Sequence, residues 1–224
     1  MKWLYRLEYK YGKYHIHNLM AVIVAGMFIV FAANMLMPQL LLSHPLASPL
    51  ALNREAIFSG QVWRLFTFIF IPNGTGFLTF ISMYFYYIMG SHLESGWGGF
   101  RFNAYYLCGI IGTIIAAMIT GFASNSYLNL SLFLAYATLA PDSQFLLFFI
   151  LPIKAKILAG AYVVIILLQI ISQFVSYSPM NGIYALVAFL FSLLNYLLFF
   201  GNGLIGTIKN EIRIAKNRRN WRNR

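Results

Sequence analysis

The chain has 224 residues, 60% of them hydrophobic and only 9% charged, and a formal net charge of +11. Soluble domains carry roughly 25% charged residues, so this composition predicts an integral membrane protein. The positive charge does not indicate nucleic-acid binding, because no folded basic module accompanies the basic residues, which suit anionic lipid headgroups better. Cys108 is the only cysteine and lies in an apolar run, so an intrachain disulfide is excluded and a packing role is expected.

Residues 1–18 are basic and aromatic. Their apolar positions recur at helical spacing, which fits either a short interfacial helix or a solvated tail. His15 and His17 have no partner ligands nearby, so they are interpreted as polar residues at headgroup level rather than as a metal site. No metal and no cofactor is expected for this chain.

Six apolar segments follow and are predicted to cross the membrane. The fourth is short: at 1.5 Å per residue it is about 21 Å long. A bilayer core is roughly 30 Å thick, so we expect the outer end of this segment to lie below the membrane surface, surrounded by other spans. The six segments are residues 19–37, 76–89, 102–120, 127–140, 157–174 and 182–200.

The stretch between the first and second spans is expected to lie in or on the membrane. Residues 39–59 are polar and punctuated by proline, and residues 60–72 are apolar. The apolar part is too short to cross, since a span needs about 20 helical residues. Trp63 and Arg64 suit this placement, because indole favours the interface and guanidinium can snorkel to headgroups.

Residues 90–101, between the second and third spans, are polar and rich in glycine, and predict a turn. Glu94 is expected to accept hydrogen bonds from amides of this turn and, with Arg101, to order it.

Small residues recur every four positions along the third span. This period lets a neighbouring helix approach closely, and we expect that neighbour to be the short fourth span. The predicted packing residues are Gly109, Gly112, Ala116 and Gly121.

Six spans place both termini on one side of the membrane. That side carries the basic residues of both tails, of residues 90–101 and of residues 141–156, whereas the other side has only Arg54 and Arg64. The positive-inside rule therefore predicts that both termini are cytoplasmic. The predicted parts are an N-terminal tail (1–18), a membrane domain (19–201) and a basic C-terminal tail (202–224).

Three stretches carry a resemblance to a known family. They are WRLFTFIF from Trp63, GSHLESGWGGFRFNAYYLCGIIG from Gly90 and APDSQFLLFFILPIKAK from Ala140. They resemble the rhomboid superfamily, including its bacterial members. The resemblance implies an all-α bundle of six transmembrane helices with a membrane-embedded first loop and a short central fourth helix. The structural motif residues that it implies are Trp63, Arg64, Glu94, Trp97, Gly98 and Arg101.

Rhomboid proteases use a serine in a GxSG motif at the start of the fourth span and a histidine base in the sixth. A histidine and an asparagine in the second span stabilise the oxyanion. The family pattern puts the nucleophile at Ser126, whose context SNSY lacks both glycines. The sixth span contains no histidine, and Asn181 or Tyr184 falls near the position of the base.

The remaining catalytic positions are degenerate as well. In the second span the asparagine position reads Ser82, and the histidine position reads Leu78 or Thr79. A serine–lysine dyad is out of reach, because Lys154 and Lys156 follow the far end of the fourth span, about 20 Å from the nucleophile position. The serine there is therefore interpreted as a helix cap.

The chain is thus interpreted as a catalytically inactive rhomboid-like protein, a pseudoprotease that recognises or scaffolds transmembrane segments of client proteins, as derlins and inactive rhomboids do. One alternative is an active intramembrane serine protease with a divergent site. A second is a small-solute transporter or channel, although the predicted spans lack the ionisable residues that usually mark such paths. Its path would be lined by Asn129, Ser131, Gln169 and Asn195. The composition and short tails predict a multi-pass protein of a bacterial plasma membrane.

Overall fold

The computed structural model describes residues 2–36, 49–74, 76–147 and 151–222, and these are mostly helical. Residues 37–48, which hold His44 and the first half of the expected polar loop, lie outside the described residues.

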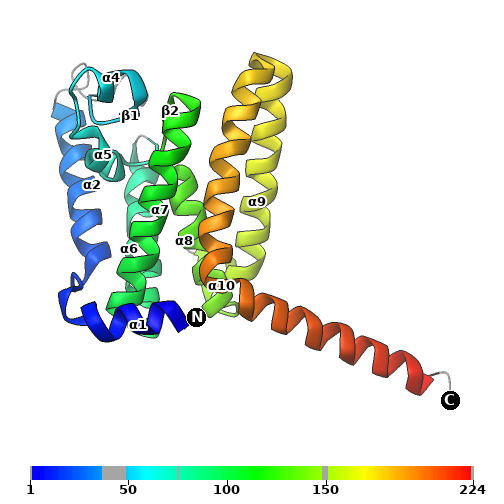
Figure 1. Ribbon diagram of the computed structural model, residues 1–224. Helices are drawn as coiled ribbons and strands as arrows, with labels where there is room; N and C mark the ends of the chain where they lie inside the picture. Colours follow the sequence, from blue (N-terminus) through cyan, green and yellow to red (C-terminus); the bar gives the residue numbers. More distant parts are fainter. Residues whose placement is uncertain (1, 37–48, 75, 148–150, 223–224) are drawn as a thin grey trace.

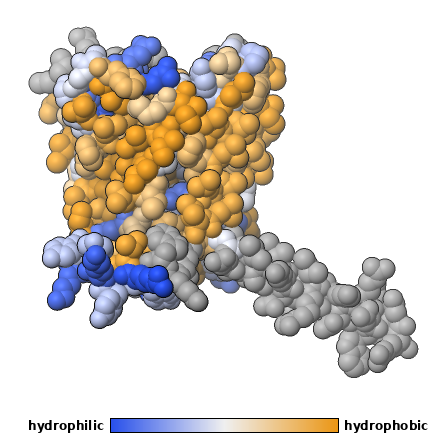
Figure 2. All heavy atoms as spheres, in the orientation of Figure 1, coloured by the Kyte–Doolittle hydropathy of each residue, from blue (hydrophilic) through white to orange (hydrophobic). Residues whose placement is uncertain are grey.

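Four helices are long and apolar enough to cross a membrane. Figure 1 shows them running roughly parallel or antiparallel through the molecule, and Figure 2 shows an apolar belt between two more polar ends. These are the features of a membrane protein. The four are α2 (Leu19–Leu36), α7 (Gly99–Thr120), α9 (Ala155–Ser172), which continues through the π-helical turn η3 (Gln173–Tyr177), and the first half of α10 (Pro179–Arg222).

Two further helices, α6 (Phe77–Trp97) and α8 (Ser126–Leu139), lie among these four (Figure 1). α6 is long, but the polar residues in its last two turns make it less apolar, whereas α8 is apolar but has only 14 residues. α8 contacts α6, α7, α9 and α10, and consecutive residues from Leu128 to Leu132 are all buried. The short helix expected over residues 127–140 is therefore enclosed by its neighbours.

The predicted turn over residues 90–101 is wrong. α6 continues to Trp97 and α7 begins at Gly99, so the chain turns at Gly98 alone, with φ at 94°. The helix continues because Met89, Leu93 and Trp97 keep one apolar face at helical spacing after the sequence has become polar. A positive φ is accessible to glycine at little cost, so Gly98 stops the helix.

The small residues of α7 differ in what they pack against. A Cβ on Gly109 would lie 2.4 Å from Leu128 Cδ1 of α8 and 2.9 Å from Asn195 Nδ2 of α10, so this glycine allows close approach of both helices. The short helix is not the only neighbour of this face, because the face also meets α10, on which α7 as a whole packs most extensively. Gly121 is not a packing residue: it caps the C-terminus of α7 in the left-handed conformation, with φ at 94°.

The loop expected in the membrane packs over one end of the bundle (Figure 1). Its strand β1 (Leu52–Asn53) pairs antiparallel with β2 (Phe122–Ala123), which links α7 to α8. Its helical pieces are α4 (Arg54–Phe58), α5 (Arg64–Thr67) and η2 (Phe68–Phe70).

Four short elements lie at the opposite end. α1 (Lys2–Tyr11) and the 3-10 turn η1 (Gly12–Tyr14) run across the bundle, so the N-terminal tail is helical rather than a solvated coil (Figure 1). A hairpin of β3 (Gln144–Leu147) and β4 (Leu151–Lys154) follows α8. The backbone of α10 stays helical to Arg222, so residues 202–222 prolong a span instead of forming an irregular tail.

Candidate functional site

The buried side chain of Arg64 organises the loop between α2 and α6. Only 8% of it is exposed; its Nη1 donates to Ala51 O at 2.7 Å and its Nε donates to Gln61 Oε1 at 2.8 Å. Burial lowers the pKa of Arg64, but a guanidinium titrates so high that it stays charged. The prediction that Arg64 snorkels to headgroups is therefore wrong: its charge holds the loop backbone.

Two residues near Arg64 in the sequence complete this arrangement: Trp63, the N-cap of α5, and Thr67, the last residue of α5. Trp63 is half exposed and donates from Nε1 to Pro49 O at 3.2 Å, and Thr67 Oγ1 donates to Leu50 O at 3.0 Å. Together with Arg64 they pair three consecutive carbonyls of the incoming chain. The WR pair is thus a structural clamp in this protein.

Glu94 and Arg101 act on the N-terminal segment instead of on a turn between spans. Glu94 Oε1 accepts a hydrogen bond from the amide of Asn18 at 2.7 Å, at the start of α2. Arg101 pairs with Glu8 at 2.8 Å and lies over the ring of Tyr5 at 4.5 Å. The expectation that Glu94 accepts from turn amides is wrong, because the predicted turn is helical and its amides are bonded within α6.

Trp97 lies at the centre of an aromatic cluster at the end of the bundle that carries α1. Its ring lies 4.9 Å from Phe200, 5.5 Å from Phe199 and 5.8 Å from Tyr105, measured between centroids. These contacts join the end of α6 to α7 and α10. Trp97 and Gly98 are therefore structural residues at the end that carries α1.

Ser126 is the first residue of α8, but it is not the cap. Asn125 occupies the N-cap position, and the hydroxyl of Ser124 accepts a hydrogen bond from the Ser126 amide at 3.1 Å. Ser126 Oγ accepts from Ser124 Oγ at 2.8 Å and donates to Asn73 Oδ1 at 3.2 Å. Neither partner is a base at neutral pH.

The other catalytic positions do not gather at Ser126. Ser192, not Asn181 or Tyr184, is the α10 residue level with the start of α8, since its Oγ donates to Tyr127 O at 2.5 Å. By helix rise, positions 181 and 184 lie about 12 to 17 Å farther along α10. Leu78 is 68% exposed, and Ser82 Oγ donates to the carbonyl of Thr79.

The three histidines within the described residues lie elsewhere. The rings of His15 and His17 are 4.2 Å apart beside α1, and His92 is 5.3 Å from Tyr136, near the opposite end of α8 from Ser126. Among the described residues no group of three or more His, Cys, Asp or Glu could hold a metal ion.

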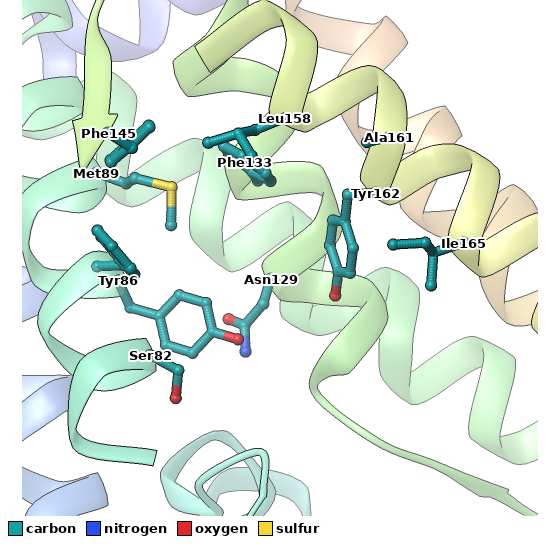
Figure 3. A pocket seen from close by; sticks show the side chains of 11 residues that line it. Ser82, Tyr86, Met89, Asn129, Phe133, Phe145, Leu158, Ala161, Tyr162 and Ile165 are labelled. Carbon is teal, nitrogen blue, oxygen red and sulfur yellow. The ribbon is translucent and has the colours of Figure 1, made fainter. Parts of the chain in front are cut away.

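A cavity of about 360 Å³ lies between α6, α8 and α9 (Figure 3). We call it the α6–α8–α9 groove. On its α9 wall Ala161 is exposed and Ile165 is 50% exposed, so this wall lies on the outer apolar surface of the bundle. The lining residues are Ser82, Phe85, Tyr86, Met89, Asn129, Phe133, Phe145, Leu158, Ala161, Tyr162 and Ile165.

One amide stands out in this apolar lining. Asn129 is 1% exposed, and neither its Nδ2 nor its Oδ1 has a hydrogen-bond partner among the described residues. The Tyr86 hydroxyl points at this amide and interacts with it, but short of hydrogen-bond geometry (Figure 3). From the sequence, Asn129 was a candidate only for lining a transport path; its position in this groove depends on the packing of three helices.

A smaller cavity of about 250 Å³ lies beside the loop between α2 and α6, lined in part by Asn73, Ser124 and Ser126. Asn73 Nδ2 donates to Tyr86 OH at 3.4 Å. Tyr86 therefore connects the polar surroundings of Ser126 to the groove.

No family model matches the chain, and no curated protein matches it.

Proposed function

We propose that the chain is a rhomboid-like membrane protein that binds transmembrane segments of other membrane proteins without cleaving them. The α6–α8–α9 groove carries the proposal. It is apolar, it opens on the lipid-facing surface, and it is walled by α9, the least buried of the candidate spans. Apolar grooves beside helices suit the side chains of another helix.

In this proposal α6 and α8 also count as spans, which makes six. The described basic residues then divide as the positive-inside rule requires. Arg101, Lys154 and Lys156 lie at the α1 end, and Arg54 and Arg64 lie at the other. Both termini would be cytoplasmic in a bacterial plasma membrane, with the basic tails on anionic headgroups.

The neighbours of Ser126 support binding without turnover. A serine hydroxyl becomes a nucleophile only when a base within about 3 Å, or one water away, takes its proton. Here its two side-chain partners are a serine hydroxyl and an amide oxygen.

Co-purification of a tagged transmembrane peptide from mixed micelles tests the proposal. Wild-type protein should retain the peptide intact, and Ser126→Ala should change neither the retained amount nor the peptide half-life. Ala161→Phe, which fills the groove, should lower retention several-fold. Ala25→Phe, on the exposed face of α2, is the matched control and should not. Equal retention by both phenylalanine variants would remove the groove as the binding site.

A further inference from the structure

The groove contains a hydrogen-bonding group that its own walls leave unsatisfied. Both polar atoms of the Asn129 carboxamide are buried and unpartnered within the part of the chain that the structure describes. Leaving a polar group unpaired in an apolar site is unfavourable, because its hydrogen bonds to water are lost and not replaced. A buried amide in this state favours any ligand that can both donate a hydrogen bond to it and accept one from it.

The surroundings of Asn129 match such a ligand. Tyr86 and Tyr162 turn their hydroxyls toward the same space, and Ser82 lies on the α6 wall (Figure 3). The rest of the lining is aromatic and aliphatic, so a ligand must be largely apolar with one polar group at the depth of Asn129.

We propose that the groove selects transmembrane segments that carry a carboxamide side chain, Asn or Gln, which pairs with Asn129. This inference rests on the proposed function and names the class of client. A carboxamide donates through its NH₂ and accepts through its C=O, so it can form two reciprocal hydrogen bonds with the Asn129 amide.

The size of the groove fits this assignment. A volume of about 360 Å³ has room for inserted side chains but not for a whole helix. The client helix therefore lies along the exposed rim formed by Ala161 and Ile165 and inserts its polar side chain toward α8. A lipid acyl chain could fill the apolar part, but it has no group along its length to pair with Asn129.

The test uses the full-length protein in vesicles of phosphatidylcholine and phosphatidylglycerol. The probes are lysine-flanked leucine–alanine peptides of about 20 residues, long enough to span, that differ only in a central Asn or Leu. Energy transfer between labelled peptide and labelled protein reports binding. Hydrogen bonds between helices in membranes predict that the Asn peptide binds about 3- to 15-fold more tightly.

Two variants assign this preference to one side chain. Asn129→Leu should abolish the difference between the peptides, while leaving the melting temperature unchanged or higher, because no internal hydrogen bond is lost. Asn181→Leu makes the same change at an exposed position of α10 and should keep the preference.

Each other result has a separate meaning. Equal binding of Asn and Leu peptides to the wild type would overturn the carboxamide preference and leave the proposed function standing. Failure of every peptide to bind would overturn both. A melting temperature that falls in Asn129→Leu together with loss of all binding would show that the amide is structural, which also overturns the inference.

Discussion

Single polar side chains in this protein stabilise backbone groups at the ends of the bundle. Arg64 reaches Ala51 O, Arg54 Nη1 donates to Met118 O at 3.1 Å, and Glu94 accepts from Asn18 N. Each contact joins segments far apart in the sequence. Backbone groups in loops lack helix or strand partners, so side-chain hydrogen bonds of this kind satisfy them and hold the loops in place.

Arg64→Ala should destabilise the protein by about 2 to 4 kcal/mol, since buried hydrogen bonds from a charged group are lost and carbonyls are left unpaired. Chemical unfolding in detergent, followed by tryptophan fluorescence, measures the change. Trp63→Phe keeps the ring and removes one bond from a half-exposed side chain, so it should cost about 1 kcal/mol or less. Equal stability of Arg64→Ala and wild type would contradict the clamp.

At the scale of elements, α6 continues beyond the apolar segment from which a helix was predicted. It passes Gly90 and Gly96 and stops only at Gly98. Gly90 is required there for a reason of packing: a Cβ would lie 2.2 Å from Met20 Cγ and 2.5 Å from Met20 Cβ of α2.

Gly90→Ala should therefore push α2 away from α6 and destabilise the protein by about 1 to 3 kcal/mol. Gly96→Ala is the matched control on the same helix, because a Cβ at position 96 meets no described atom within 4 Å. Alanine is the better helix former, so the control should be neutral or stabilising by about 0.5 to 1 kcal/mol. If the melting temperature falls equally in both variants, the packing role of Gly90 is refuted.

The β3–β4 hairpin should weaken in acid. Lys154 and Lys156 hold the pKa of Asp142 below its ordinary value of 3.8, through contacts of 3.0 and 3.3 Å. Because the folded pKa is the lower one, the pairs contribute fully above the unfolded pKa, and the contribution is lost as the pH falls through the folded pKa. The effect should be small and salt-dependent, since all three side chains are largely exposed.

Hydrogen exchange of residues 151–154, corrected for intrinsic rates, would report this change between about pH 5 and about pH 2.5. Asp142→Asn should remove the pH dependence. An Asp142→Asn protein with the same acid response as the wild type would show that another group is responsible.

For the whole molecule, the bounds of helices were predicted best where the sequence changes sharply between apolar and polar residues. The first span, predicted over 19–37, is α2 (Leu19–Leu36), and the short helix predicted over 127–140 is α8 (Ser126–Leu139). Hydropathy could not find the end of α6, because a helix that leaves an apolar environment needs only one apolar face.

The site was less predictable than the fold. The direction of Arg64 and the groove around Asn129 depend on contacts between residues more than ten positions apart. The hydrogen bond from the Ser126 amide to Ser124 depends on the geometry of the turn before α8. Rhomboid-like membership and binding without cleavage remain proposals that rest on the motif resemblance and the groove.

Site-specific crosslinking in the membrane tests client binding most directly. A photoreactive phenylalanine at Ile165, on the groove wall, is compared with one at Ile29, an exposed position of α2 that is 70% exposed. The account predicts that intact transmembrane peptides crosslink from position 165 at several times the yield from position 29. Equal yields, or cleaved peptide that disappears in Ser126→Ala, would contradict it.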